Sequence, residues 1–536
     1  MAEGKVVLRT NRSVAWILGV VVASAFFVGS QVSLSTYAEE SPSGDLAFDE
    51  EDMDFILQQI KYAERHAAGE DLLDILPNAS VPWGLRTVDG SFNNLIPGRE
   101  DFGQVDKEFP ISTDRQYRPA QDNTHYNQGD GSSVVDSTPR LISQLIVNQS
   151  TENPAAVFAA SLNEDSENVG EDITGVDQLK IPTVAADEGL SAPFNAYITF
   201  FGQFFDHGLD LVNKGGNGMI FMPLHPTDPL YDPSEGARNV MLLTRATVDG
   251  GPDRVIGTED DVLNPVNATT PHVDQNQTYT SHPSAQVLLR HYEVRGGRLQ
   301  DTGRLLDGFG NDGELDTPDD GGLATWDTVQ LQASEKLGID LNDFDGINLP
   351  MIAADPYGNF IPGPERGLPQ LVLESGDLRE GNVDDPVDTT GAMQINHSFL
   401  IDIAHTASPI GHQGPLQPDD DNVLNARTDG LPDQPSRGIR AAGEVGSYDD
   451  ELLGVHFVCG DGRCNENIAL TAIHSIFHRE HNRLTNVAKR VILDQRNLDK
   501  LNEWLDTPEE EFPNWGELDF PISDASLVHQ KEAHDA

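Results

Sequence analysis

The sequence predicts a mainly α-helical fold with long irregular insertions, and two stretches support that prediction. In FFGQFFDHGLDL, residues 200–211, polar side chains recur at helical spacing among phenylalanines and leucines. Residues 459–493 show an apolar repeat of the same period over a longer span. Residues 214–262 and about 300–390 are instead rich in Gly, Asp and Pro, a composition typical of turns. We therefore expect helices separated by surface insertions.

The first stretch predicts a buried helix, which we place at residues 192–213. Phenylalanines and leucines cover most of its surface, and a helix that is apolar nearly all round is a buried helix. The remaining polar residues share one helical face: Gln203, Asp206, His207 and Asp210. Because a polar face on a buried helix needs partners, these side chains are candidate functional residues.

The second stretch, CGDGRCNENIALTAIHSIFHREHNRLTNVAKRVIL, predicts a long helix over residues 466–493. Gly-Asp-Gly indicates a turn, and Asn465 is a suitable residue to cap the helix that follows. Arg463 then lies in the loop just ahead of the helix.

The histidines and cysteines of this stretch do not form a recognisable zinc site. The histidine spacing lacks both H-E-x-x-H and H-x-x-E-H, so we expect surface or packing histidines at these positions: His474, His478 and His481. Cys459 and Cys464 are too few for a zinc ligand set. They form either a local disulfide or a pair of free thiols.

The N-terminus has the pattern of a secretory signal. Basic residues precede an apolar stretch from Val14 to about Val32, and we place cleavage after Ala38. An uncleaved membrane anchor is the alternative, because the apolar run is long. We expect a secreted, extracellular protein without stable membrane insertion after cleavage. The net charge of −54 repels nucleic acid and anionic lipid, which excludes nucleic-acid binding as a function class.

A third stretch, NATTPHVDQNQTYTS at 267–281, is a candidate cation loop. Thr270, Asp274 and Asn276 place oxygen-bearing side chains close together in a turn-prone segment. Hard cations take this mixture of carboxylate, hydroxyl or amide oxygens with backbone carbonyls. Taken alone, the stretch is equally typical of a polar surface loop.

Together these stretches resemble the animal-type haem peroxidases, the group of myeloperoxidase and the peroxinectins, and in particular its bacterial members. The matching motifs occur in the family's order: GQFFDHGLD, TTPHVDQN and GDGRCNENIALTAIHSIFHREHNRL, with weaker support from RTVDGSFNNL. The resemblance covers roughly residues 80–490. It implies the helical haem-peroxidase fold, haem b and calcium as cofactors, and a reaction in which hydrogen peroxide oxidises a small-molecule or halide donor.

The resemblance also implies roles for single residues. His207 matches the distal histidine that acts as acid and base, Arg463 the arginine that stabilises charge, and Gln203 the glutamine one turn earlier. Asp206 and Glu466 match the acids that form ester bonds to haem. A neutral histidine can carry a proton from one peroxide oxygen to the other, while a fixed guanidinium stabilises the departing oxygen.

Two departures from the family's pattern concern haem and calcium. Asn467 stands where myeloperoxidase has a methionine bonded to haem, so that link should be absent. The calcium ligands implied by the resemblance are Thr270, the backbone carbonyl of His272, Asp274 and Asn276. The family's further ligand, an aspartate directly after the distal histidine, is replaced by Gly208. Asp210 or a water molecule would then complete the site.

The expected domain layout follows the resemblance. It comprises a signal peptide at 1–38, an acidic segment at 39–79, the distal half of a haem peroxidase domain at 80–495 and a tail at 496–536. The family's proximal histidine lies in a Gly-His context that neither His529 nor His534 matches. We therefore expect a domain that is incomplete before the proximal ligand, which stays unassigned, and a chain with weak or no activity.

Two alternative functions stay open at this point. A non-enzymatic adhesion or matrix module of the peroxinectin type fits the acidity of the chain, although it leaves the polar face of the first helix unexplained. A fatty-acid oxygenase of the cyclooxygenase type shares the fold but lacks the ester-forming acids. Asp206 and Glu466 therefore favour the peroxidase.

Overall fold

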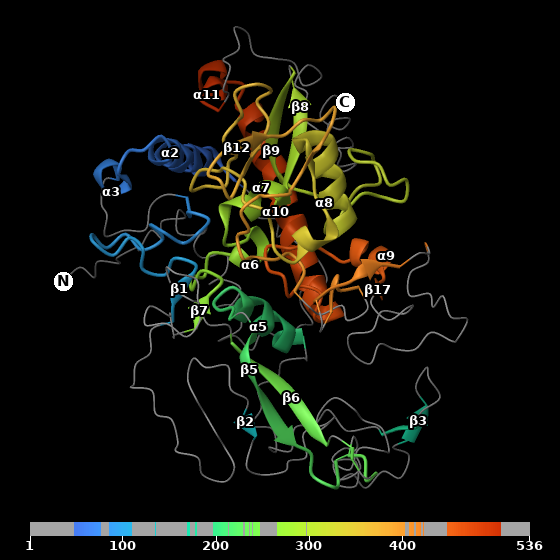
Figure 1. Cartoon of the computed structure of the whole chain (residues 1–536). Helices are drawn as coiled ribbons and strands as arrows, with labels where there is room; N and C mark the ends of the chain where they lie inside the picture. Colours follow the sequence, from blue (N-terminus) through green and yellow to red (C-terminus); the bar gives the residue numbers. More distant parts are fainter. Residues whose placement is uncertain are drawn as a thin grey trace, which may run out of the picture. The chain divides into compact units, whose positions relative to one another are not determined.

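The computed structural model describes part of the chain. The described residues are 48–76, 85–109, 197–212, 214–228, 231–234, 236–237, 239–246, 265–295, 297–401, 407–411, 414–419, 422 and 447–504, together with three short strands at 134–135, 169–171 and 177–179. The expected signal peptide and the histidines of the tail lie outside these residues. The chain divides into two compact units (Figure 1), which are Met1–Val105, Thr199–Asp210 and Thr269–Ala536, and Asp106–Ile198 with Leu211–Ala268.

The main hydrophobic core of the first unit is built largely from residues 283–400. Its helices and strands are α7 (Pro283–Leu289), β8 (Arg290–Arg295), β9 (Arg298–Leu305), α8 (Trp326–Gln332), η3 (Ala333–Leu337), β10 (Ile339–Asp340), η4 (Asp343–Gly346), β11 (Gln370–Val372), β12 (Leu378–Glu380) and β13 (Val387–Asp388). Strands β8 and β9 form an antiparallel hairpin, and β11 pairs with β12 in the same way. Trp326, Leu337 and Leu349 are completely buried.

The prediction of an irregular surface insertion at about 300–390 is therefore wrong. Turns rich in Gly and Asp alternate here with short apolar pieces, and those pieces converge on one core. Each piece is too short to show a period of its own, which is why composition alone suggested a surface segment. The short strand pairs outside this core are β14 (Ile410–Gly411) with β15 (Gly414–Pro415), and β16 (Gln417–Pro418) with β17 (Ser447–Tyr448).

An N-terminal helix packs on the end of the long helix. Helix α2 (Glu50–Ala67) begins at a capping box formed by Asp49 and Asp52, and α3 (Leu72–Ile75) follows it. Met53 of α2 is buried with Ile492 and Leu493 of α10 (Ile468–Asp494) and with Leu501 of α11 (Leu498–Asn502). The first described part of the acidic segment is thus a packed helix.

The two helices predicted from the sequence are present and pack together, as expected. Helix α5 (Tyr197–His207) contributes Phe204, whose ring stacks on Phe477 of α10 with centroids 4.5 Å apart. Leu470 and Ile473 of α10 complete this buried cluster. The α10 bounds agree closely with the predicted range, and two further short helices, α6 (Asn276–Tyr279) and α9 (Asp450–Gly454), lie in the same unit.

The described part of α5 is shorter than predicted, because it ends at His207 instead of residue 213. A Cβ atom at Gly208 would lie 2.3 Å from the side-chain oxygen of Gln277, so the chain passes close to α6 at this point. Gly208 and Leu209 form a turn, in which the N–H groups of Leu209 and Asp210 donate to the carbonyl of Asp206.

The second unit contains short strand pairs. Strand β1 (Lys107–Glu108) pairs with β7 (Val266–Asn267), and β3 (Val169–Glu171) pairs with β4 (Asp177–Leu179). A three-stranded sheet has the order β2 (Val134–Val135), β5 (Lys214–Pro223) and β6 (Val240–Ala246). The expected irregular insertion at 214–262 thus includes a regular antiparallel pair, β5 with β6, which the turn-rich composition did not indicate.

The described residues combine helices with short strands, and the longest element among them is helix α10. A mainly α-helical fold is consistent with these elements. No helix among the described residues is long and apolar enough to cross a membrane.

Candidate active site

Helix α5 ends on the side chain of Arg463. The last carbonyl groups of an α-helix have no partner within the helix and carry a partial negative charge. Nη2 of Arg463 donates hydrogen bonds to the carbonyl oxygens of His207 at 2.9 Å and Asp210 at 2.8 Å. The guanidinium from the loop before α10 therefore completes the C-terminal end of α5.

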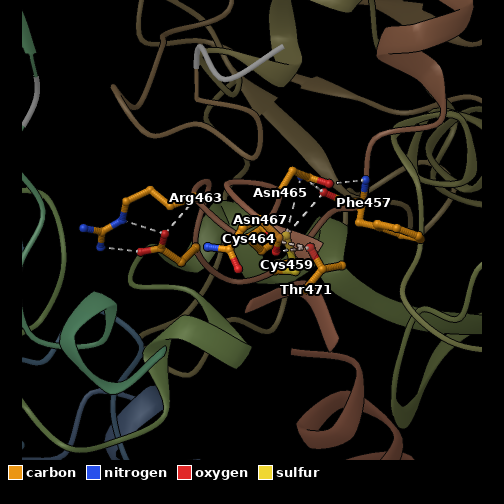
Figure 2. The surroundings of a disulfide bond; sticks show 8 residues. Phe457, Cys459, Arg463, Cys464, Asn465, Asn467 and Thr471 are labelled. Atoms are coloured by element: carbon orange, nitrogen blue, oxygen red, sulfur yellow. Dashed lines mark hydrogen bonds and ion pairs between the residues drawn. A yellow bond between two sulfur atoms is a disulfide. The ribbon is translucent and has the colours of Figure 1, made fainter. Parts of the chain in front are cut away.

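A buried carboxylate fixes this guanidinium. Asp461 accepts hydrogen bonds from Nε and Nη2 of Arg463 at 2.9 and 2.8 Å, and from the backbone N–H of Arg463 at 2.9 Å. In Figure 2 the side chain of Arg463 extends away from the disulfide. Burial alone would raise the pKa of Asp461, but the hydrogen bonds and charge of Arg463 outweigh it and lower the pKa. The pair is thus ionised.

His207 is buried at the end of α5, with 5% of its surface exposed. Loss of solvation lowers the pKa of its imidazole, and this outweighs the opposing effect of Asp461. Nε2 of His207 lies 3.6 Å from Oε2 of Glu466, while Nδ1 is buried without a hydrogen-bond partner. The environment therefore favours the neutral imidazole, which can accept a proton.

Hydrogen bonds orient Gln203 between the two helices. Its Nε2 donates to Oε2 of Glu466 at 2.8 Å, and its Oε1 accepts from Nδ2 of Asn467 at 3.0 Å. Asn467 also caps α10 by accepting from the N–H of Leu470. The residue at the methionine position thus holds Gln203, a role that sequence reasoning did not assign.

The structure therefore brings together residues predicted from separate stretches of sequence. They are Gln203, His207, Arg463 and Glu466. Asp206 lies on the same helix with its side chain exposed, one residue before His207. Asp210 contacts Arg463 through its backbone, with its side chain exposed. Sequence reasoning missed Asp461, although an aspartate two residues before an arginine, across a glycine, was a usable signal.

The three histidines of α10 face the interior. His474 is 2% exposed, its ring packs edge-on against Phe204, and burial lowers its pKa to about 3. His478 bonds to Asp307 at 2.9 Å. His481 bonds to the hydroxyl of Tyr279 at 2.9 Å and to a backbone carbonyl at 3.0 Å. These are packing histidines with separate partners.

The predicted cation loop forms a cluster of oxygen atoms. Four of them surround Nδ2 of Asn276: the carbonyl oxygens of Gly208 at 2.6 Å and Thr270 at 3.0 Å, Oγ1 of Thr270 at 2.8 Å and Oδ1 of Asp274 at 2.9 Å. An amide nitrogen has only two hydrogens to donate to these acceptors. The donor set suits a hard cation better than an amide.

The rest of this loop is held by neutral and charged contacts. Oδ2 of Asp274 pairs with Nε of Arg86 at 3.2 Å and accepts from Asn93 at 3.0 Å and from Oγ1 of Thr270 at 3.0 Å. Gly208 contributes its carbonyl oxygen to the set, at the position where the family has an aspartate. The side chain of His272 packs against Gly103.

Residues 425–495 match the family model described as animal haem peroxidase. This match supports an animal haem peroxidase family member. It covers a small portion of the chain, which includes Arg463, Glu466 and α10 but neither α5 nor the cation loop. No curated protein matches the chain. The description of this family names haem and peroxidase chemistry, and the similarity is that of the matched segment.

Proposed function

We propose that this protein is a haem-dependent peroxidase that uses hydrogen peroxide to oxidise small donors or halides. The observation that carries the proposal is the bond from Nη2 of Arg463 to the carbonyl of His207, which joins residues 256 positions apart. The family match includes Arg463 and Glu466, and α5 supplies the histidine and glutamine that the chemistry needs.

The side chains around this bond fit a haem group. The carboxyl groups of Asp206 and Glu466 are both accessible, and Glu466 keeps 34% of its side chain exposed. Large apolar side chains are exposed beside them, with Leu209 at 38% and Ile468 at 89%. A mostly apolar macrocycle held by two ester bonds needs this combination. Bound haem would supply an iron that accepts two oxidising equivalents from peroxide.

The protein's own groups would then move the proton and hold the charge. His207, neutral because burial lowers its pKa, accepts a proton from one peroxide oxygen and returns it to the other. Arg463 keeps its positive charge because Asp461 raises its pKa against the effect of burial. Since its guanidinium is fixed before the reaction, it stabilises the developing negative charge without reorganisation. Gln203 would orient the peroxide.

Calcium is the second proposed cofactor. The oxygen atoms around Asn276 would bind it, after the amide turns its oxygen toward the cluster. Because Gly208 follows His207 directly and contributes its carbonyl, the bound cation would stabilise the end of α5. We also propose that the protein is secreted, which is supported by the disulfide between Cys459 and Cys464.

The decisive experiment uses purified full-length protein incubated with haem. We expect a Soret band that survives acid–acetone extraction, because ester bonds retain the haem. The double variant Asp206→Asn/Glu466→Gln should bind haem and release it on extraction. Peroxide-dependent oxidation of guaiacol, which we expect to be weak in this chain because no proximal ligand is assigned, should fall about a hundredfold or more in His207→Ala, because this variant lacks the acid–base group.

His225→Ala is the matched control, because His225 is an exposed histidine that contacts Thr227. It should keep the haem spectrum and the guaiacol rate of the wild type. A protein that remains colourless after incubation with haem would contradict the proposal and favour a non-enzymatic matrix module. Oxidation that is equally fast in His207→Ala would contradict the assigned role of His207.

A further inference from the structure

The loop that carries Asp461 and Arg463 is closed by a disulfide bond between Cys459 and Cys464. The Cα atoms of the two cysteines lie 6.3 Å apart. Both cysteines are buried, at 3% and 0% exposed, and pack against Leu323. The charged pair of the candidate site therefore lies inside a small covalent ring, which is closed by the disulfide drawn in Figure 2. Because both cysteines are buried, the sulfur atoms are shielded from solvent.

The loop sequence is flexible by itself. Gly460 and Gly462 flank Asp461, and glycine has more backbone freedom than any other residue. Both glycines are needed for close approach: a Cβ atom at Gly460 would lie 2.6 Å from the carbonyl oxygen of Asn276, and one at Gly462 would lie 2.9 Å from that of Ser398. Tight packing thus requires glycine at both positions, and glycine by itself does not restrict the backbone of the loop to one conformation.

The ends of the ring are anchored on two sides. Ahead of Cys459, the N–H of Val458 donates to the carbonyl of Ala324 at 2.8 Å. The carbonyl of Cys464 accepts a hydrogen bond from Oγ1 of Thr471, in the first turns of α10, at 2.7 Å. The disulfide links these two anchors directly. It therefore fixes the distance between the two ends of the loop that carries Asp461 and Arg463.

We propose that Cys459 and Cys464 are positioning residues whose disulfide holds Arg463 on the C-terminal end of α5. Hydrogen bonds between residues of the ring are short-range turns, such as the N–H of Cys464 to the carbonyl of Asp461 at 3.3 Å, while the N–H of Ile401 donates to the carbonyl of Gly462 at 3.3 Å from outside the ring. Opening the ring lets those turns break, and the guanidinium loses its fixed relation to His207. The consequence for catalysis rests on the proposed function, whereas the consequence for loop order does not.

The test compares Cys459→Ala/Cys464→Ala with the wild type and with Leu323→Ala. The control removes packing on the disulfide but leaves the ring closed. Hydrogen exchange followed by mass spectrometry reports on residues 457–467. We expect exchange in this segment to become at least about tenfold faster in the double variant, with the middle of α10 unchanged. Leu323→Ala should leave the segment unchanged relative to α10.

Wild-type protein reduced with dithiothreitol gives a second measurement that needs no substitution. Reduction should raise exchange in the same segment, and reoxidation should restore its protection. Equal exchange with the ring open and closed would overturn the proposal. A change of equal size throughout α10 would also overturn it, because it would show general destabilisation in place of local positioning.

Haem-loaded protein supplies the catalytic measurement. The rate constant for reaction with hydrogen peroxide should fall about ten- to a hundredfold in the double variant, because small misplacements of charged groups cost about this much. The haem content and the KM for guaiacol should stay at wild-type values, which a merely structural defect would not preserve. Unchanged peroxide kinetics with an open ring would overturn the catalytic part. If the wild type binds no haem, the proposed function fails, and hydrogen exchange still decides the positioning role.

Discussion

Nη2 of Arg463 donates a hydrogen bond to the backbone carbonyl oxygen of His207 across 2.9 Å. The arginine thereby contacts the histidine through the end of its helix instead of through the imidazole ring. One interaction satisfies an otherwise unpaired carbonyl and places a fixed positive charge beside a proton acceptor. Stability and the proposed chemistry therefore depend on the same guanidinium.

The first prediction concerns the partner of that guanidinium. Asp461→Ala leaves Arg463 largely buried without its carboxylate, and breaking a buried ion pair in this way costs about 3–5 kcal/mol. Urea denaturation should show a loss in the free energy of unfolding near the lower end of that range. The control is Glu480→Gln, which breaks a half-exposed pair with Arg483 and should cost less than about 1 kcal/mol. Equal losses in the two variants would contradict the buried-pair interpretation.

Sequence periodicity predicted α5 and α10 and their contact because aromatic and apolar residues recur at helical spacing in both. It did not predict where α5 ends. That end depends on contacts with residues distant in sequence, Gln277 against Gly208 and Arg463 on the last carbonyls. A glycine directly after the last helical residue was the available signal, because glycine is common just past helix ends.

The candidate site was predicted only in part, because local patterns select residues but not the contacts between distant segments. Residue types and spacing selected His207 and Gln203, the family resemblance selected Arg463, and the structure places them around one helix end. Gln203 donates to Glu466 and accepts from Asn467, which joins α5 to the residues just ahead of α10, so no local pattern contains these hydrogen bonds. The core at 300–390 was missed because its apolar residues are scattered among turns and only meet in three dimensions.

The second prediction concerns the contact between α5 and α10. Phe204 is completely buried and stacks on Phe477, so Phe204→Ala removes a large apolar side chain and leaves a cavity. Such substitutions cost about 3–5 kcal/mol. The measurement is the free energy of unfolding in urea. Phe102→Ala is the control: this side chain is 62% exposed, and its loss should change stability by no more than about 0.5 kcal/mol. Similar values for both variants would show that the α5–α10 contact does not form.

The third prediction concerns pH and His474. Burial is the largest cause that lowers its pKa, to about 3 from an ordinary value of 6.5, with His207 and Arg463 adding to the effect and Asp461 opposing it. Between pH 6.5 and about pH 3, the unfolded chain therefore binds a proton at His474 that the folded protein does not bind. Stability is fully present above pH 6.5 and falls as the pH drops toward 3, by about 1.4 kcal/mol per pH unit for this group.

The measurement is the slope of the unfolding free energy against pH between 6 and 4. His474→Phe keeps an aromatic ring beside Phe204 but cannot titrate, so the slope should decrease by about one proton. Phe201→Leu alters the same cluster without changing a titratable group, and it should keep the wild-type slope. An identical slope in His474→Phe and the wild type would mean that His474 is not buried in neutral form.

The last prediction concerns calcium. The oxygens of Gly208, Thr270 and Asp274 converge on the amide nitrogen of Asn276, more acceptors than its two hydrogens can satisfy. A bound cation would relieve this mismatch and bind only the folded protein, so calcium should raise the Tm and excess EDTA should lower it. Asp274→Asn removes the charged ligand and should abolish the difference between calcium and EDTA. Asp384→Asn, at an exposed aspartate, should retain it.

Because Asp274 also pairs with Arg86, Asp274→Asn is expected to lower the Tm in both conditions, and only the loss of the calcium-dependent difference identifies the site. A wild-type Tm that is the same in calcium and in EDTA would refute calcium binding at this loop.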